Sequence, residues 1–105
     1  MTQTLPKLDD AARDKIEAAV YRRLRDHLMA RTDVQNIDLM NLSGFCRNCL
    51  SRWWQEAAED HGVTVTKDQG REIVYGEPYD DWRDKHQTEA GADQQATFDK
   101  NRPAH

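Results

Sequence analysis

Two cysteines are the residues of this chain whose type and spacing best suit chemistry. Cys46 and Cys49 lie in the stretch SGFCRNCLSRWW, residues 43–54, with two residues between them. A thiolate attacks disulfides and binds metals, and the positive end of a helix favours its formation. With Ser43 predicted as a helix N-cap, Cys46 falls in the first helical turn. The pair is therefore a candidate thiol-redox site.

A metal site is a second interpretation of the same cysteines. A structural zinc ion takes four protein ligands, and a catalytic one takes three and keeps an open position. The signal is weak, because the chain has no second C-x-x-C and no H-x-x-x-H. The metal-ligand candidates are Cys46, Cys49, His27, His61 and His86. Zinc is the metal that such a set would take, whereas the leading interpretation expects no cofactor.

Burial in a core is the third interpretation and the one that we favour. On a helix, Cys46, Leu50 and Trp53 fall on nearly one line with Ala57, and Cys49 lies on its flank. Free cysteine is among the most buried residue types. We therefore expect Cys46 to be buried and unreactive and Cys49 to be partly accessible. The opposite, polar side of this helix carries Arg47, Asn48, Ser51, Gln55 and Glu59.

Helical periodicity organises the chain before this segment. A helix is predicted at residues 11–31, with Asp9 or Asp10 as its N-cap. Its apolar residues recur every four positions, which is a helical period and not a strand period. They are Ile16, Val20, Leu24 and Leu28. A short second helix is predicted at residues 34–42, and a long third one from Gly44 to His61.

The segment at residues 63–75 has two interpretations. Alternating valines and a turn-like Asp-Gln-Gly are typical of a β-hairpin. Alternatively, Thr66 is an N-cap and Gln69 completes a capping box, which predicts a helix that ends at Gly76. We favour the helix. Further along the chain, a helix is predicted to begin at Pro78, and one more short helix near residues 93–100.

Length and composition predict one small domain. The chain has 105 residues, of which 37% are hydrophobic and 32% are charged. These patterns together indicate an all-α fold, a compact array of about five helices at residues 9–100. Residues 1–8 are expected to form a flexible arm, and residues 101–105 a disordered tail. A chain this poor in apolar residues gains burial by self-association, so we expect a homodimer.

Charge and motifs disfavour several classes of function. A net charge of −4 disfavours nucleic acid as a partner. We expect a cytoplasmic protein without membrane contact, because the N-terminus has no apolar signal segment and no apolar run could span a bilayer. Gly-rich phosphate loops, G-x-S-x-G and H-E-x-x-H are absent from the sequence, which leaves no motif for an enzyme.

A non-enzymatic structural or interaction module is therefore the leading functional hypothesis, with the thiol or metal protein as its alternative. Aromatic residues are enriched at protein interfaces. They gather in the predicted third helix and in the segment VYGEPYDDW. The expected interaction surface consists of Trp54, Tyr75, Pro78, Tyr79 and Trp82.

Two stretches of the chain resemble a known family. DLMNLSGFCRNCLSRWWQEAAEDHG, residues 38–62, and REIVYGEPYDDWRDKHQTEA, residues 71–90, carry the resemblance, with GFCRNCL and EIVYG-PY-W as the specific phrases. They are similar to a small bacterial family of uncharacterised proteins, domain of unknown function 1244. The resemblance covers nearly the whole chain and implies an all-helical fold. It implies no activity, cofactor or catalytic residue.

Overall fold

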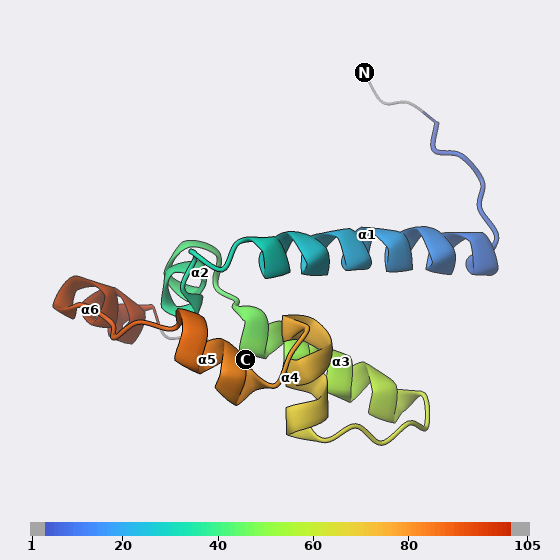
Figure 1. Ribbon diagram of the computed structural model, residues 1–105. Helices are drawn as coiled ribbons and strands as arrows, with labels where there is room; N and C mark the ends of the chain where they lie inside the picture. The colour runs from blue at the N-terminus through green and yellow to red at the C-terminus, as the bar shows by residue number, and fades with distance from the viewer. Residues whose placement is uncertain (1–3, 102–105) are drawn as a thin grey trace.

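The computed structural model describes residues 4–101, and all regular structure in that range is α-helical (Figure 1). The predicted all-α class is confirmed, with six helices among the described residues in place of about five. The hairpin alternative for residues 63–75 is wrong, because this segment forms α4. The helices are α1 (Asp10–Ala30), α2 (Asn36–Ser43), α3 (Arg47–Asp60), α4 (Lys67–Tyr75), α5 (Tyr79–His86) and α6 (Ala92–Lys100).

Both predicted terminal segments extend past the described range. The expected arm begins in residues 1–3, and most of the expected tail lies in residues 102–105, so these parts fall outside the described residues. Residues 4–9 have no regular structure and lead into α1. No helix of the described range has both the length and the apolar character that crossing a bilayer requires.

Helix α1 begins where the sequence predicts and packs differently from the prediction. The Asp9 side chain accepts a hydrogen bond from the backbone N–H of Ala12 at 2.7 Å, which caps the helix. Of the four apolar residues spaced along α1, Leu28 alone is buried. The other three, Ile16, Val20 and Leu24, are exposed.

The boundary between α2 and α3 corrects the predicted start of the third helix. Ser43 does not cap that helix but is the last residue of α2, and Gly44 follows in the left-handed conformation, with φ of 79°. A glycine adopts this conformation without steric cost and commonly ends a helix. Cys46 is then extended and is the N-cap of α3, which begins at Arg47 and not at Gly44.

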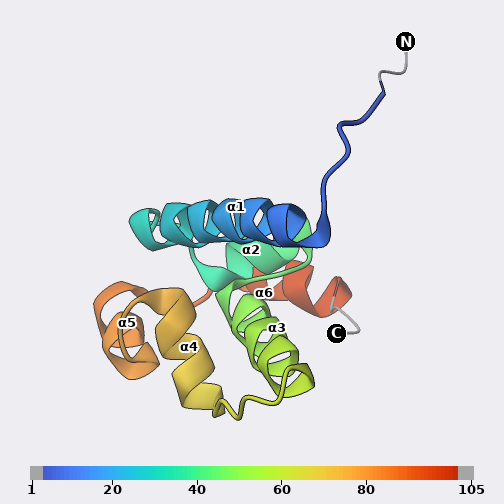
Figure 2. The same cartoon turned by 90° about the vertical axis from the view of Figure 1, so that its right-hand side faces the viewer.

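Helix α4 confirms the favoured interpretation of its segment. Thr66 and Gln69 form the predicted capping box, and Gly76 ends the helix. α4 lies beside α3, and α5 lies beside α4. In the view of Figure 2, α4 and α5 lie below α1. Gly70 permits this close approach, because a Cβ atom there would lie 3.0 Å from the backbone oxygen of Ser51.

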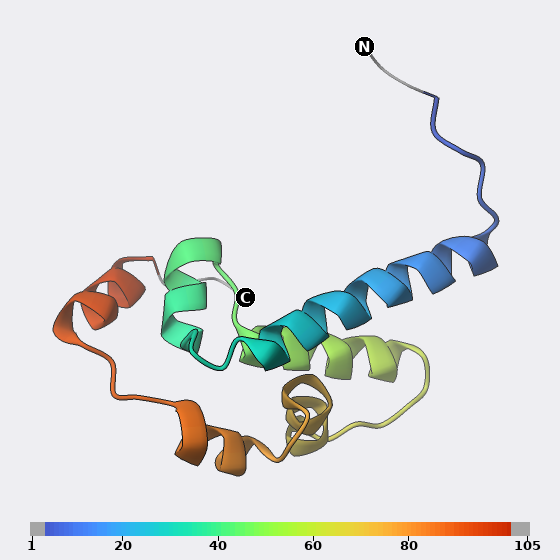
Figure 3. The same cartoon turned by 45° about the horizontal axis from the view of Figure 1, so that its top comes forward.

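The core is small and the molecule is extended. The buried cluster consists of Leu28, Leu50, Val74, Tyr75 and Trp82. At the other end, α6 packs against α2 (Figure 1). The N-terminal end of α1 extends past the other helices (Figures 1 and 3). The radius of gyration is 16.4 Å, against about 13 Å for a compact domain of this length.

Candidate functional site

The two cysteines lie together at the start of α3. Cys46 is 7% exposed and Cys49 is half-buried. Their sulfur atoms are 3.9 Å apart, and both are free thiols. The Cys49 sulfur also lies 3.7 Å from the sulfur of Met40 on α2. The burial of Cys46 and the partial accessibility of Cys49 agree with the core interpretation.

Two opposing effects act on the Cys46 thiol. Its place at the N-cap of α3 favours a thiolate, because the backbone N–H groups there point toward it. Burial disfavours the charged form and raises the pKa of Cys46, so desolvation outweighs the helix end. The neutral thiol is therefore the resting state of the buried member of the pair at neutral pH.

The three histidines considered as metal ligands lie apart from the cysteines. His27 is exposed on α1. His61 is exposed at the end of α3, with Nδ1 2.8 Å from the backbone oxygen of Ala57. His86 packs its ring 5.4 Å from the ring of Trp82. Across residues 4–101, no three His, Cys, Asp or Glu side chains converge as metal ligands.

A buried arginine dominates the first turn of α3. Arg47 is 1% exposed. Its Nη1 donates to the backbone oxygen of Val34 at 2.8 Å, and its Nη2 donates to those of Leu28 at 3.1 Å and Arg31 at 2.8 Å. The guanidinium lies over the Trp82 ring, 4.9 Å from its centroid. It thus ties α3 to the carbonyl groups at the C-terminal end of α1.

Arg47 corrects the predicted orientation of α3. The sequence pattern places Arg47 and Ser51 on the polar side and Trp53 on the buried line. In the structure Arg47 and Ser51 are buried, whereas Trp53 is 40% exposed. Two contacts explain why this side of α3 faces inward. The Arg47 guanidinium donates hydrogen bonds to the carbonyl groups at the end of α1. The backbone of Ser51 packs against Gly70 of α4. No sequence signal separates Arg47 from the other arginines of the chain.

A polar network extends from Arg47 to α4. Its Nη1 also donates to Asn36 Oδ1 at 3.1 Å. The Asn36 amide donates to the Tyr75 hydroxyl at 2.9 Å, and that hydroxyl donates to Asn48 Oδ1 at 2.6 Å. Burial raises the pKa of Tyr75 and lowers that of Arg47. The network joins α2, α3 and α4 through neutral partners and one cation.

The expected interaction surface is only partly at the surface. Tyr75 and Trp82, 5% and 2% exposed, belong to the core, so their assignment to a surface is corrected. Their ring centroids are 4.9 Å apart, and the guanidinium of Arg47 lies over the Trp82 ring. Tyr79 and Trp54 are half-buried and Pro78 is exposed. The aromatic segment at residues 75–82 therefore serves mainly the fold.

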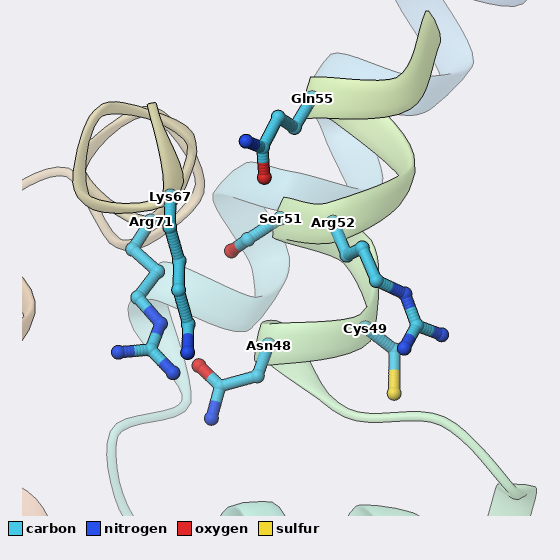
Figure 4. Close-up of a pocket in the computed structure, with 7 residues that line it drawn as sticks. All are labelled: Asn48, Cys49, Ser51, Arg52, Gln55, Lys67 and Arg71. Carbon is cyan, nitrogen blue, oxygen red and sulfur yellow. The ribbon is translucent and has the colours of Figure 1, made fainter. Parts of the chain in front are cut away.

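A cationic pocket lies between α3 and α4, with a volume of about 410 Å³ (Figure 4). Three cationic side chains line it: Arg52 from α3, and Lys67 and Arg71 from α4. No carboxylate belongs to its lining, and the half-buried Cys49 does. The sequence did not predict this pocket, because its cations come from two consecutive helices and converge only when α4 packs against α3.

Apolar side chains are exposed on α1 and in two hollows beside α3. On α1 they are Ile16, Val20 and Leu24, which are 51%, 65% and 41% exposed and which we call the α1 strip. Beside α1 and against α3 lies a hollow of about 230 Å³, which we call the α1–α3 hollow. Its lining consists of Tyr21, Leu50, Trp53, Trp54 and Ala57. A second apolar hollow of about 270 Å³ shares Trp54 and Ala57 and continues to Val63.

Comparison with known proteins places the chain in a family without adding an activity. A family model described as "Protein of unknown function (DUF1244)" matches residues 34–100. This match spans α2 to α6 and includes both cysteines and Arg47. No curated protein matches the chain.

Proposed function

Because the chain belongs to the DUF1244 family, whose description names no activity, we propose a function from the geometry: it is a non-enzymatic interaction module whose partner is a second copy of itself. The observation that carries the proposal is the exposed α1 strip. Burying one such aliphatic side chain is worth about 1.5–3 kcal/mol. A chain with 37% hydrophobic residues leaves three of them in water on one helix.

The shape of the molecule supports self-association. The N-terminal end of α1 extends past the other helices (Figure 1). The α1–α3 hollow offers an apolar surface beside it. A two-fold dimer presents the same surfaces from both copies, so each projecting α1 covers the surface of the other. The interface would join the α1 strip to Trp53 and Ala57.

The charges along α1 favour an antiparallel arrangement. Its N-terminal part carries Asp10, Asp14 and Glu17 against Arg13 and Lys15, and its C-terminal part carries Arg22, Arg23 and Arg25 against Asp26. An antiparallel pair of α1 helices therefore sets an acidic part against a basic one and opposes the helix dipoles. With Val20 at the two-fold axis, residues 16 and 17 of one copy lie at the same heights along the pair as residues 24 and 23 of the second copy, so the acidic part of one α1 runs along the basic part of the other.

Sedimentation of the full chain tests the dimer. We expect the native chain to sediment as a dimer in the micromolar range. Val20→Glu places a charge at the two-fold axis and should give a folded monomer. Ala96→Glu adds the same charge at an exposed position of α6 and should leave the dimer intact. A native chain that sediments as a monomer throughout this range would refute the proposal.

A charge exchange tests the antiparallel register. Glu17→Arg and Arg23→Glu each set like charges against one another across the axis, so each should weaken the dimer. The double variant restores the opposite charges of the two parts of α1 and should recover part of the lost affinity, because positions 17 and 23 lie at one height only between copies. Equal weakening in the double variant would rule out this register.

The thiol pair supports a second candidate function, thiol–disulfide exchange with a small disulfide. The specific observation is the distance of 3.9 Å between the sulfur atoms of Cys46 and Cys49, which a modest rotation reduces to the bond length of about 2.0 Å. The Cys49 thiolate attacks one sulfur of the small disulfide and releases the other as a thiol. Cys46 then attacks Cys49, loses its proton and releases the second thiol. The two cysteines are oxidised, and the small disulfide is reduced to two thiols.

Mass spectrometry of the intact protein tests this exchange with oxidised glutathione as the probe. We expect the native chain to lose two hydrogen atoms without retaining glutathione. In Cys46→Ser the mixed disulfide should persist on Cys49, because the resolving thiol is absent. A native chain that keeps glutathione on Cys49, or does not react, would exclude a dithiol function.

A further inference from the structure

The cationic pocket between α3 and α4 concentrates positive charge on a chain whose net charge is −4. Arg52 is paired with Glu56, 3.6 Å away on the same helix. Neither Lys67 nor Arg71 has a carboxylate within ion-pair distance among residues 4–101. The pocket therefore holds two cations whose charge nothing in the described structure neutralises.

Several of the donors in this pocket are held in place. The guanidinium of Arg71 lies over the ring of Tyr79, 4.3 Å from its centroid. Asn48 Oδ1 accepts a hydrogen bond from the Tyr75 hydroxyl. This fixes the orientation of the Asn48 side chain and leaves its NH2 group to donate to a ligand. Lys67 and Arg71 extend from α4 toward Asn48 on α3 (Figure 4). Fixed donors bind an anion with a smaller loss of side-chain entropy than mobile ones.

The walls of the pocket belong to the most closely packed part of the fold. Gly70 brings α4 against the backbone of α3 at Ser51, whose side chain is 3% exposed. The Ser51 hydroxyl donates to the backbone oxygen of Arg47 at 2.8 Å and is not available as a donor to a ligand. Arg71 and Lys67 therefore project from a helix that cannot move away from α3 without opening the core.

We propose that this pocket binds the phosphoryl group of a small phosphorylated molecule. A planar guanidinium, an ammonium and an amide supply the charge-assisted hydrogen bonds that phosphate oxygens accept. A volume of about 410 Å³ lies within the range of about 300–1,000 Å³ that is usual for small-molecule sites. The pocket lies on α3 and α4, so its occupation is independent of the dimer proposed through α1.

Titration of the full chain with inorganic phosphate tests the proposal. Backbone amide resonances of the isotope-labelled chain are followed at constant ionic strength, with sodium chloride as the balancing salt. We expect saturable changes at residues 48–55 and 67–71. Lys67→Gln should raise the dissociation constant about tenfold, since it removes one charged donor. Lys67 is exposed, so this variant is expected to fold.

Two comparisons make the result decisive. Lys100→Gln makes the same change at an exposed position on α6 and should leave phosphate binding unaltered. Succinate, a dicarboxylate, should bind more weakly than phosphate. Linear, unsaturable changes spread over the whole chain, equal weakening in both lysine variants, or succinate binding as tight as that of phosphate would each overturn the proposal.

Discussion

The first turn of α3 places a charged side chain in the interior, whereas the outer side of α1 leaves aliphatic side chains in water. Arg47 is 1% exposed and Val20 is 65% exposed. Arg47 donates to three backbone carbonyls and to Asn36, and it lies on the ring of Trp82. Nothing in residues 4–101 covers the α1 strip. Burial in this molecule therefore follows the available partners more closely than it follows polarity.

The two regions have different roles because of this difference. A buried cation with directed hydrogen bonds has one good position, so it sets how α1, α2 and α3 meet. An exposed aliphatic strip contributes little to the isolated chain and gains its free energy only when another surface covers it. We therefore expect substitutions in the Arg47 network to change folding, and substitutions in the α1 strip to change assembly.

The largest expected effect comes from Arg47→Ala. This change removes four charge-assisted hydrogen bonds and the packing on Trp82, so we expect a loss of about 3 kcal/mol or more in the free energy of unfolding. Arg47→Lys should recover only part of it, because an ammonium does not reproduce the planar fork. Chemical denaturation gives the values, with Arg22→Ala on the exposed side of α1 as the control. Similar losses in Arg47→Ala and Arg22→Ala would contradict the role assigned to Arg47.

A smaller effect is expected from Tyr75→Phe. It leaves Asn48 Oδ1 without its donor and the Asn36 amide without its acceptor, in a part-buried setting. We expect a loss of about 1–3 kcal/mol in the free energy of unfolding. The matched control is Tyr79→Phe, whose hydroxyl donates to Gln87 at 3.2 Å in an exposed setting and should cost much less. Equal losses in the free energy of unfolding for Tyr75→Phe and Tyr79→Phe would show that the network does not stabilise the fold.

The pH dependence of stability reports on Cys46. Its thiol ionises near pH 8.5 in an unfolded chain, and burial raises its pKa in the folded one. The contribution of the neutral Cys46 thiol to the free energy of unfolding is therefore complete below about pH 8.5 and is lost as the pH rises further. Cys46→Ala should flatten the stability profile between about pH 8 and 9.5. An unchanged slope in that variant would show that Cys46 is not the group responsible.

The smallest effect on folding is expected at the surface. Val20→Ser should change the free energy of unfolding of the dilute, monomeric chain by no more than about 0.5 kcal/mol, because the side chain is already in water. Val74→Ser, the same substitution at a residue that is 1% exposed, should cost about 2 kcal/mol or more. Equal costs at the two positions would mean that α1 is packed against the chain itself.

Local hydrogen-bonding patterns in the sequence were sufficient to predict where most of the helices begin. Asp9 as the cap of α1 and the capping box of Thr66 and Gln69 follow from short-range hydrogen bonds within one turn, so they were predictable. The start of α3 was missed because Ser43 is a preferred N-cap residue, whereas Cys46 takes the N-cap position of α3 without a side-chain cap hydrogen bond. Gly44 sets this boundary, since its left-handed conformation ends α2 and leaves Cys46 extended before α3.

The sequence by itself determined the all-α class and most helix boundaries. Cys46 is buried as predicted, but not for the predicted reason, because it precedes α3 and Trp53 of the predicted buried line is exposed. Only the tertiary structure decided which side of each helix faces inward. Helical periodicity identifies an apolar side but not its partner, so it predicted Trp53 inside and Arg47 outside. Arg47 is buried because the carbonyl groups that accept its hydrogen bonds, at Leu28, Arg31 and Val34, come to it from 13 to 19 residues away in the chain. Contacts between such distant residues leave no local pattern.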